Sequence, residues 1–154
     1  MFRHYLLFCI TAFILLGCNN DIVYDKKVVF DEAWTYNDVQ EFTFDIIDTI
    51  PAHDILLEVI HDKHFAFQNI YTKVTTIFPD QQKVEHQVSL QLTDALNVWV
   101  GDCDSKNCTA SLVLSENIYF NQTGKYIILL EQYGRTDSLK GMMGFHFKVI
   151  HSKK

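Results

Sequence analysis

Apolar and polar residues alternate along most of this chain with a period of two. Successive side chains of a β-strand point to opposite faces of a sheet, so this alternation predicts strands that are buried on one face. No stretch of 12 residues shows the 3.6-residue period of an amphipathic helix. At most, a single helical turn is expected at 95–100 or 115–119. The clearest alternating runs are 42–46, 55–59, 74–78, 84–92, 112–114, 126–130 and 145–149.

Turn-forming residues separate these runs, at 36–38, 49–51, 79–81, 121–124 and 140–141. The run 126–130 is apolar at every position, which predicts a strand buried on both faces. About seven or eight strands separated by turns favour an all-β fold, and an antiparallel β-sandwich above a small barrel.

The chain begins with a different pattern. Arg3 is followed by an apolar run from Leu6 to Leu16, and Gly17 then precedes Cys18. A basic start, an apolar core and a small residue before the cut site are typical of a secretory signal peptide. The run has 11 residues, whereas a helix needs roughly 20 to span a bilayer. A membrane-spanning anchor is therefore disfavoured.

The segment Leu15–Cys18 resembles the bacterial lipobox, Leu-x-Gly-Cys. The resemblance implies cleavage before Cys18, a diacylglycerol on its thiol and a third acyl chain on the new amino terminus. One acyl chain holds a protein on a membrane only marginally, whereas two or three hold it firmly. Cys18 is thus the predicted lipidation site, and the mature protein is expected outside the cytoplasm. The alternative is a plain signal peptide or short signal anchor with a chance cysteine.

Three segments follow from these patterns. Residues 1–17 are expected to form a lipoprotein signal peptide, residues 18–27 a polar, flexible, lipidated tether, and residues 28–154 a single β-sandwich domain. Cleavage leaves 137 of the 154 residues, which is enough for one domain with its own core.

The charge balance excludes one class of partner. Cleavage removes only one charged residue, Arg3, so the net charge changes from −6 to −7. The largest basic clusters are the pairs Lys26–Lys27 and Lys153–Lys154. Phosphate binding needs a basic surface, so nucleic acid is not expected as a partner.

Two of the four cysteines remain for pairing once Cys9 is cleaved away and Cys18 carries lipid. Cys103 and Cys108 flank a polar loop in an oxidising compartment, which favours a disulfide. A ring of this size contributes roughly 2 kcal/mol, enough to hold a loop but not a fold. Free thiols are an alternative. A zinc site is disfavoured because no second cysteine pair exists.

Seven histidines raise the question of a metal site. His61 and His64 form the densest group, but on a strand they would point to opposite faces. These two, with His53, His86 and His146, are expected at the surface. The 102–107 loop is rich in oxygen ligands, but Lys106 stands where a calcium loop needs a ligand. No metal and no cofactor are predicted.

Hydrolytic motifs are also missing from the sequence. There is no Gly-x-Ser-x-Gly elbow and no phosphate-binding glycine loop. The carboxylates alternate with apolar residues on what should be solvent faces, so no acid pair stands out. We expect no enzymatic activity and no catalytic residue.

Aromatic residues make up 14% of the chain, including 12 Phe and 7 Tyr. Phe65, Phe67 and Tyr71 cluster in the middle of the chain, and most of the aromatic residues are expected in the core. Trp and Tyr at strand ends also anchor interfaces, either with protein partners or as a platform for sugars. Trp34 and Trp99 are the candidates of this kind.

Several segments together resemble the gliding-motility lipoprotein H family (GldH) of the Bacteroidota. After the lipobox they are Ala33–Asn37, Phe42–Ile46, His64–Tyr71, Leu92–Gly101, Gly124–Tyr126, Glu131–Leu139 and Gly141–Phe145. The most specific is an aromatic strand that ends in Arg135, followed by a leucine and Gly-x-x-Gly.

This resemblance implies a lipoprotein of the gliding-motility and type IX secretion machinery, held on a membrane by lipid on Cys18. It implies an outer-membrane location facing the periplasm, a non-enzymatic assembly role, and partners among the other gliding and secretion proteins of the envelope. The predicted partner contacts are Arg135, Tyr133, Trp99 and Trp34. For Arg135 the alternative is a turn cap that binds carbonyls. The second functional hypothesis is a binding lipoprotein whose sandwich holds a glycan or peptide.

Overall fold

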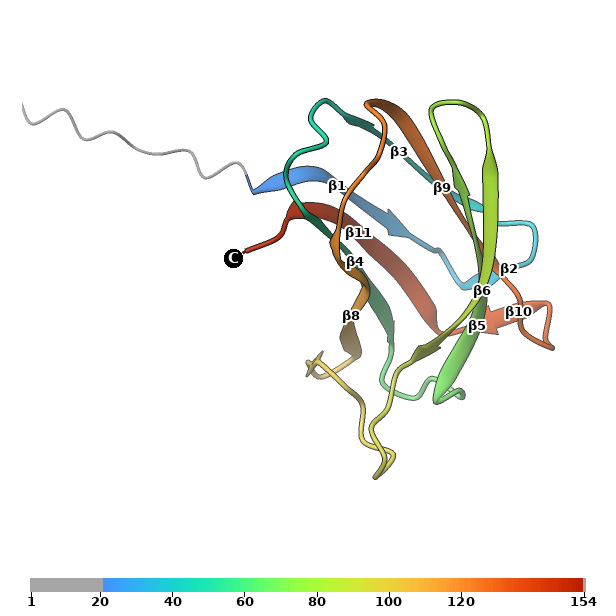
Figure 1. The fold of residues 1–154 in the computed structure, drawn as a ribbon. Coiled ribbons are helices and arrows are strands. Elements are labelled where there is room, and N and C mark those ends of the chain that lie inside the picture. The colour runs from blue at the N-terminus through green and yellow to red at the C-terminus, as the bar shows by residue number, and fades with distance from the viewer. Residues whose placement is uncertain (1–20, 154) are drawn as a thin grey trace, which may run out of the picture.

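The computed structural model describes residues 21–153. In this range the chain forms eleven strands and no helix, so it contains no helical segment suited to crossing a membrane. Every strand pairing is antiparallel, and two sheets pack face to face (Figure 1). The prediction of an all-β, antiparallel sandwich is confirmed. Both expected helical turns are wrong, since 115–118 continues a strand and 95–100 is a loop.

One layer is a five-stranded sheet. Its order is β1 (Ile22–Val29), β11 (Met142–His151), β4 (His53–Asp62), β8 (Asn107–Ile118) and β7 (Asp102–Cys103). The strand β4 lies at the centre and alternates strictly between buried and half-buried residues. This is the pattern that the period of two predicts for one face packed on a core.

The other layer is a four-stranded sheet, in the order β3 (Gln40–Ile46), β9 (Gly124–Gln132), β5 (Asn69–Ile77) and β6 (Lys83–Gln91). A two-stranded sheet of β2 (Ala33–Thr35) and β10 (Ser138–Lys140) lies beside the sandwich. The strand β9 is buried on its inner face, but Ile127 and Leu129 on its outer face are only half-buried. The expected burial of both faces is therefore only partly met.

Aromatic rings join the two layers. Phe147 of β11 stacks on Phe42 of β3 with ring centroids 4.4 Å apart. Phe44 also contacts Phe147, with ring centroids 6.5 Å apart, and it stacks on Tyr126 of β9 at 5.9 Å. Buried aromatic pairs of this kind add about 0.5–1.5 kcal/mol each beyond the area that they bury. The sandwich is thus held by rings contributed by both sheets.

The strand β1 begins inside the segment 18–27 that was expected to be a flexible tether. Residues 22–29 pair with β11 along its length. On the outer face, His146 of β11 bridges Asp25 at 2.7 Å and Glu58 of β4 at 2.9 Å. The tether prediction is therefore wrong from residue 22 onward. The first strand starts four residues after Cys18. Cys18 and the predicted signal peptide lie outside the described residues.

Candidate functional site

Two predicted contact residues, Tyr133 and Arg135, lie in one groove of about 450 Å³. The groove is at one end of the outer face of the four-stranded sheet, beside β10. Its exposed lining includes Phe67 and Tyr71, while Ile70 and Leu139 are buried. We call this site the aromatic groove and define it by Phe67, Tyr71, Tyr133 and Arg135.

Strand pairing places the two tyrosines side by side. The backbone N–H of Tyr133 donates to the carbonyl of Tyr71 at 2.9 Å, which extends the β5–β9 ladder by one residue. Ile70 and Thr72 are buried, so Tyr71 between them points outward. The exposed fractions are 54% for Tyr71 and 51% for Tyr133. Two large amphipathic rings therefore stand together in solvent.

The 133–137 loop is held by residues other than Arg135. The Tyr36 hydroxyl donates to the carbonyl of Gly134 at 2.8 Å, and the Gln132 side-chain amide donates to the carbonyl of Thr136 at 2.7 Å. Arg135 is exposed and makes no hydrogen bond or ion pair with any residue between 21 and 153. The turn-cap role is thus not found, and five N–H donors remain available to a ligand.

Trp34 does not belong to any surface, which corrects its assignment as a partner contact. It is 0% exposed. Its ring meets the edge of Phe145 at 4.8 Å, and its indole N–H donates to the carbonyl of Asp38 at 2.8 Å. A side chain with no exposed surface and a satisfied donor is a core residue.

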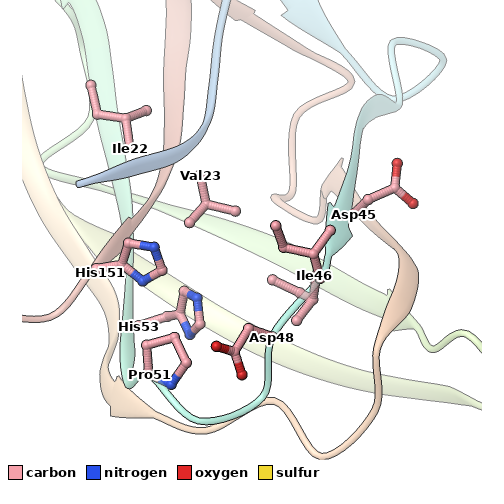
Figure 2. Close-up of a pocket in the computed structure, with 9 residues that line it drawn as sticks. Ile22, Val23, Asp45, Ile46, Asp48, Pro51, His53 and His151 are labelled. Atoms are coloured by element: carbon pink, nitrogen blue, oxygen red, sulfur yellow. The ribbon is translucent and has the colours of Figure 1, made fainter. Parts of the chain in front are cut away.

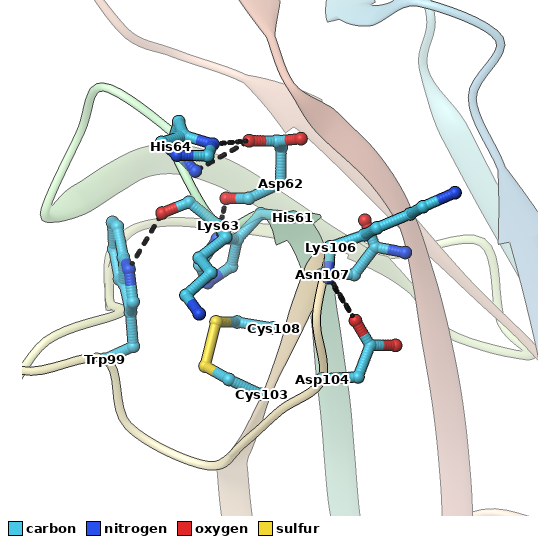
Figure 3. The surroundings of a disulfide bond; sticks show 10 residues. All are labelled: His61, Asp62, Lys63, His64, Trp99, Cys103, Asp104, Lys106, Asn107 and Cys108. Carbon is cyan, nitrogen blue, oxygen red and sulfur yellow. Dashed lines mark hydrogen bonds and ion pairs between the residues drawn. A yellow bond between two sulfur atoms is a disulfide. The ribbon is translucent and has the colours of Figure 1, made fainter.

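Trp99 lies at a different place from the groove, next to the 103–108 loop (Figure 3). It is half-buried, and its indole N–H donates to the carbonyl of Lys63 at 3.2 Å. Its ring packs on His61 at 4.5 Å. Trp99 therefore ties the 92–101 connection to the end of β4 and is separate from Tyr133 and Arg135.

Cys103 and Cys108 form a disulfide that closes this loop. Cys108 is buried on β8 and Cys103 is exposed on β7. Within the ring, the Asp104 carboxylate accepts the backbone N–H groups of Lys106 and Asn107, both at 2.7 Å. These bonds lower the pKa of Asp104. This carboxylate oxygen therefore stabilises the turn. Residues 21–153 contain no group of His, Cys, Asp and Glu side chains that could hold a metal ion.

Reduction of this disulfide is expected to lower the free energy of unfolding by about 2 kcal/mol and to leave the fold intact, because the ring is small. Urea unfolding with and without dithiothreitol measures the change. The double variant Cys103→Ala, Cys108→Ala is the control, since the reductant should not alter its midpoint. Loss of the folded baseline on reduction would show that the bond holds more than the loop.

Two histidines expected at the surface are in the core. His53 and His61 are the first and ninth residues of β4 and point inward with Ile55, Leu57 and Val59. The Nδ1–H of His61 faces the carbonyl of Asp62 at 2.9 Å, while its Nε2 has no partner. Burial lowers the pKa of both histidines, and the neighbouring His151 lowers that of His53 further. Both rings are therefore neutral core residues.

These lowered pKa values predict that the domain loses stability as the pH falls below about 6.5, the ordinary histidine value. Below this pH the histidines are protonated in the unfolded chain but stay neutral in the folded chain. The free energy of unfolding therefore decreases until the pH reaches the folded-state pKa values. Urea unfolding between pH 7.5 and pH 5 measures it, and His61→Gln should flatten the dependence. Equal slopes for both proteins would contradict this assignment.

The opposite end of the sandwich carries a second hollow, of about 680 Å³ (Figure 2). His53 and His151 lie in it with ring centroids 4.8 Å apart. The same hollow is lined by Ile22 at the start of β1 and by the loop between β3 and β4. This is the end of the domain at which the chain arrives from Cys18.

The sequence model of the GldH lipoprotein family matches residues 22–148, from the first residue of β1 into β11. The chain belongs to the GldH lipoprotein family. The Gliding motility lipoprotein GldH homolog of Christiangramia forsetii is 21% identical over 153 residues, which cover 95% of this chain and 94% of the relative. The family resemblance stated from the sequence is thereby confirmed.

A solved structure, that of infectious bursal disease virus, Gx strain, aligns with 83% of this chain at 14% identity and a TM-score of 0.34. The alignment covers 32% of the viral chain. A likeness at this level carries no argument about this GldH-family protein.

Phe67 and Tyr71 are groove residues that the sequence analysis did not name as contact residues. The alternation along β5 could have indicated that Tyr71 faces outward, because its neighbours Ile70 and Thr72 are buried. No signal in the sequence indicated that Phe67 would line the same groove as the loop after β9. That proximity comes from the sheet order, in which β9 lies next to β5.

Proposed function

We propose that this protein is a non-enzymatic assembly component of the gliding-motility apparatus and the associated type IX secretion machinery. Family membership over residues 22–148 supports it, as does the name of the relative, a gliding motility lipoprotein. The lipobox supports lipid attachment at Cys18. The proposed location is the outer membrane, with the domain in the periplasm and other gliding or secretion proteins of the envelope as partners.

One observation carries the assembly role, namely the aromatic groove with an unpaired Arg135. Tyr and Arg are enriched where protein interfaces concentrate their binding energy. Here two half-exposed tyrosines and one free guanidinium share a groove. Such a surface suits a protein segment that offers apolar area and a carboxylate, because arginine binds carboxylates through paired hydrogen bonds.

Four titratable side chains outside the groove have structural roles, which supports a non-enzymatic role. His53 and His61 are enclosed in the core, and Asp104 is used by a turn. Asp80 likewise accepts the backbone N–H of Gln82 at 3.0 Å and the side-chain amide of Gln122 at 3.1 Å. The two histidines are buried and the two exposed carboxylates hold local turns with hydrogen bonds, so each of the four has a structural role.

An affinity pull-down from gently solubilised membranes of the host tests the proposal. The wild type should recover gliding or secretion proteins in stoichiometric amounts. Tyr133→Ala with Arg135→Ala should recover much less, while both proteins stay folded. Val113→Ser is the matched control, because Val113 is also about half-exposed but lies on the other sheet.

Cys18→Ala separates the anchor from the groove in the same experiment. This variant should leave the membrane fraction and lose the partners that require membrane attachment. Clean recovery of the wild type without any envelope protein would reject the assembly role.

A second candidate function is a lipoprotein that binds a glycan or peptide. The observation that favours it is the same row of exposed rings, since Tyr71, Tyr133 and Phe67 can stack on an apolar sugar face. Recovery of glycan-uptake proteins in place of gliding proteins would favour this function. Glycan-array binding that is lost in Tyr71→Ala would identify the ligand class.

A further inference from the structure

Four large apolar side chains are exposed at the end of the sandwich where β1 begins. The exposed fractions are 91% for Ile47 and 82% for Ile50, and Ile22 and Tyr119 are also mostly exposed. They line two adjoining hollows, which share Asp48, Pro51 and His151. Scattered apolar residues on a surface need no explanation, but a group at one end of a domain indicates an interaction site. We call this group the apolar rim.

The loop between β3 and β4 is built to present two of these side chains. The Asp48 carboxylate accepts the backbone N–H of Ile50 at 2.9 Å, which closes a local turn. Pro51 follows directly and restricts the backbone before β4 begins. The turn leaves Ile47 and Ile50 on either side of Asp48, both in solvent. Surface loops normally carry polar residues at such positions.

Chain length connects the apolar rim to the lipid. Ile22 is four residues after Cys18, and a fully extended chain covers at most about 3.6 Å per residue, or roughly 14 Å in all. The strand pairs of β1 hold Ile22 in the five-stranded sheet. A lipidated Cys18 therefore keeps this end of the domain at the membrane surface. The greatest distance between Cys18 and Ile22 is about the thickness of two headgroup layers.

We propose that the apolar rim inserts into the interfacial region of a phospholipid bilayer and fixes the orientation of the domain on the membrane. Isoleucine side chains gain by leaving water at the headgroup boundary, and tyrosine is enriched at that depth. Two carboxylates, Asp45 and Asp48, and one ammonium, Lys153, line the two hollows, so this end has no excess of positive charge to attract anionic headgroups. The partner is therefore a predominantly zwitterionic phospholipid surface.

This orientation directs the aromatic groove away from the membrane. The strand β9 starts at Gly124, which pairs with Ile46 at the rim end, and it ends at Gln132 beside the groove. Nine residues of strand cover about 30 Å. The domain then stands on its rim with the groove raised into the periplasmic space. The proposal rests on the lipid at Cys18 that the proposed function includes, but it does not depend on the identity of the protein partner.

The test uses the full, lipidated protein in protein-free phosphatidylcholine vesicles. Cysteine is introduced at position 50 or 96 and carries an environment-sensitive fluorophore. Ile50 and Leu96 are both 82% exposed, and the connection that contains Leu96 hangs from the far end of the sandwich (Figure 1). The introduced thiol is the reactive one, because Cys103 and Cys108 are bonded and Cys18 is acylated.

We expect lipids with brominated acyl chains to quench the label of Ile50→Cys and to leave that of Leu96→Cys unchanged. Adding Ile47→Asp and Tyr119→Asp to Ile50→Cys should abolish the quenching, while the lipid still holds the protein on the vesicles. Equal quenching at both positions, or none at either, overturns the proposal. So does failure of the wild type to float with the vesicles, since the rim would then lack its anchor.

Discussion

Trp34→Ala is expected to lower the free energy of unfolding by about 3–5 kcal/mol, the range for removing a large aromatic side chain from a core. The ring of Trp34 is enclosed between Phe30, with centroids 6.1 Å apart, and Phe145, at 4.8 Å. The substitution also leaves the carbonyl of Asp38 without its indole donor. Urea unfolding monitored by circular dichroism measures the loss.

Tyr133→Ala is the control for this prediction, because its side chain is half-exposed and should change stability by less than about 0.5 kcal/mol. Domains of this kind are stable by only about 5–15 kcal/mol. Loss of partner binding in Trp34→Ala would therefore result from unfolding of the domain and not from the loss of a direct contact with the partner. A change below 1 kcal/mol in Trp34→Ala would be incompatible with the packing described for this ring.

Gly144→Ala is expected to destabilise the domain by about 3 kcal/mol, at the upper end of typical overpacking costs. A Cβ at position 144 would lie 2.1 Å from the carbonyl oxygen of Val28. That atom belongs to the backbone of β1, so it cannot move without separating β1 from β11. The same position follows a register shift in the pairing of β11 with β4, which allows the close approach.

The matched control is Gly134→Ala, the same substitution ten residues earlier. Its new Cβ would meet nothing closer than the backbone N of Thr136 at 4.0 Å, so we expect a change within about 0.5 kcal/mol. Hydrogen exchange then locates the damage. Amides of β1 should lose protection in Gly144→Ala more than those of the four-stranded sheet. Uniform loss across both sheets would show a global effect instead.

The sequence predicted the strands that have one face on the core and the other face toward solvent. In β4, Ile55, Leu57 and Val59 face the core and their neighbours face outward. The buried positions of this strand therefore alternate along the sequence with the outward-facing ones. The seven runs correspond to β3, β4, β5, β6, β8, β9 and β11. Burial in β6 still differs from the pattern. Its Val84 and His86 are exposed and only Leu90 is buried, because β6 is an edge strand.

The strands that escaped prediction are those without such contrast. The strand β1 has Asp25, Lys26 and Lys27 in its middle, and it lies at an edge of the five-stranded sheet. Charges on an edge strand protect it from pairing with other chains. They also interrupt the alternation of apolar and polar residues by which a strand is predicted. The strands β2, β7 and β10 have only two or three residues each and show no period.

The candidate site was predictable only in part. The family resemblance points to Tyr133 and Arg135. Trp34 is expected at an interface because Trp at strand ends anchors interfaces, but the ring is buried instead. His53 and His61 could have been placed correctly, since both are in phase with Ile55 and Leu57 along β4. The groove itself depends on β9 lying beside β5, and strand order is set by packing that a single sequence does not display.

The pairing of β1 with β11 also determines how the domain bears mechanical load. A pull on an anchor at Cys18 would enter the fold at Ile22, the first residue of β1. Antiparallel hydrogen bonds lie perpendicular to the strands, and seven residue pairs join β1 to β11. A force directed along β1 loads these bonds together in shear, whereas a force that peels β1 sideways breaks them one at a time. A domain anchored at Cys18 would therefore resist tension best when the pull follows β1.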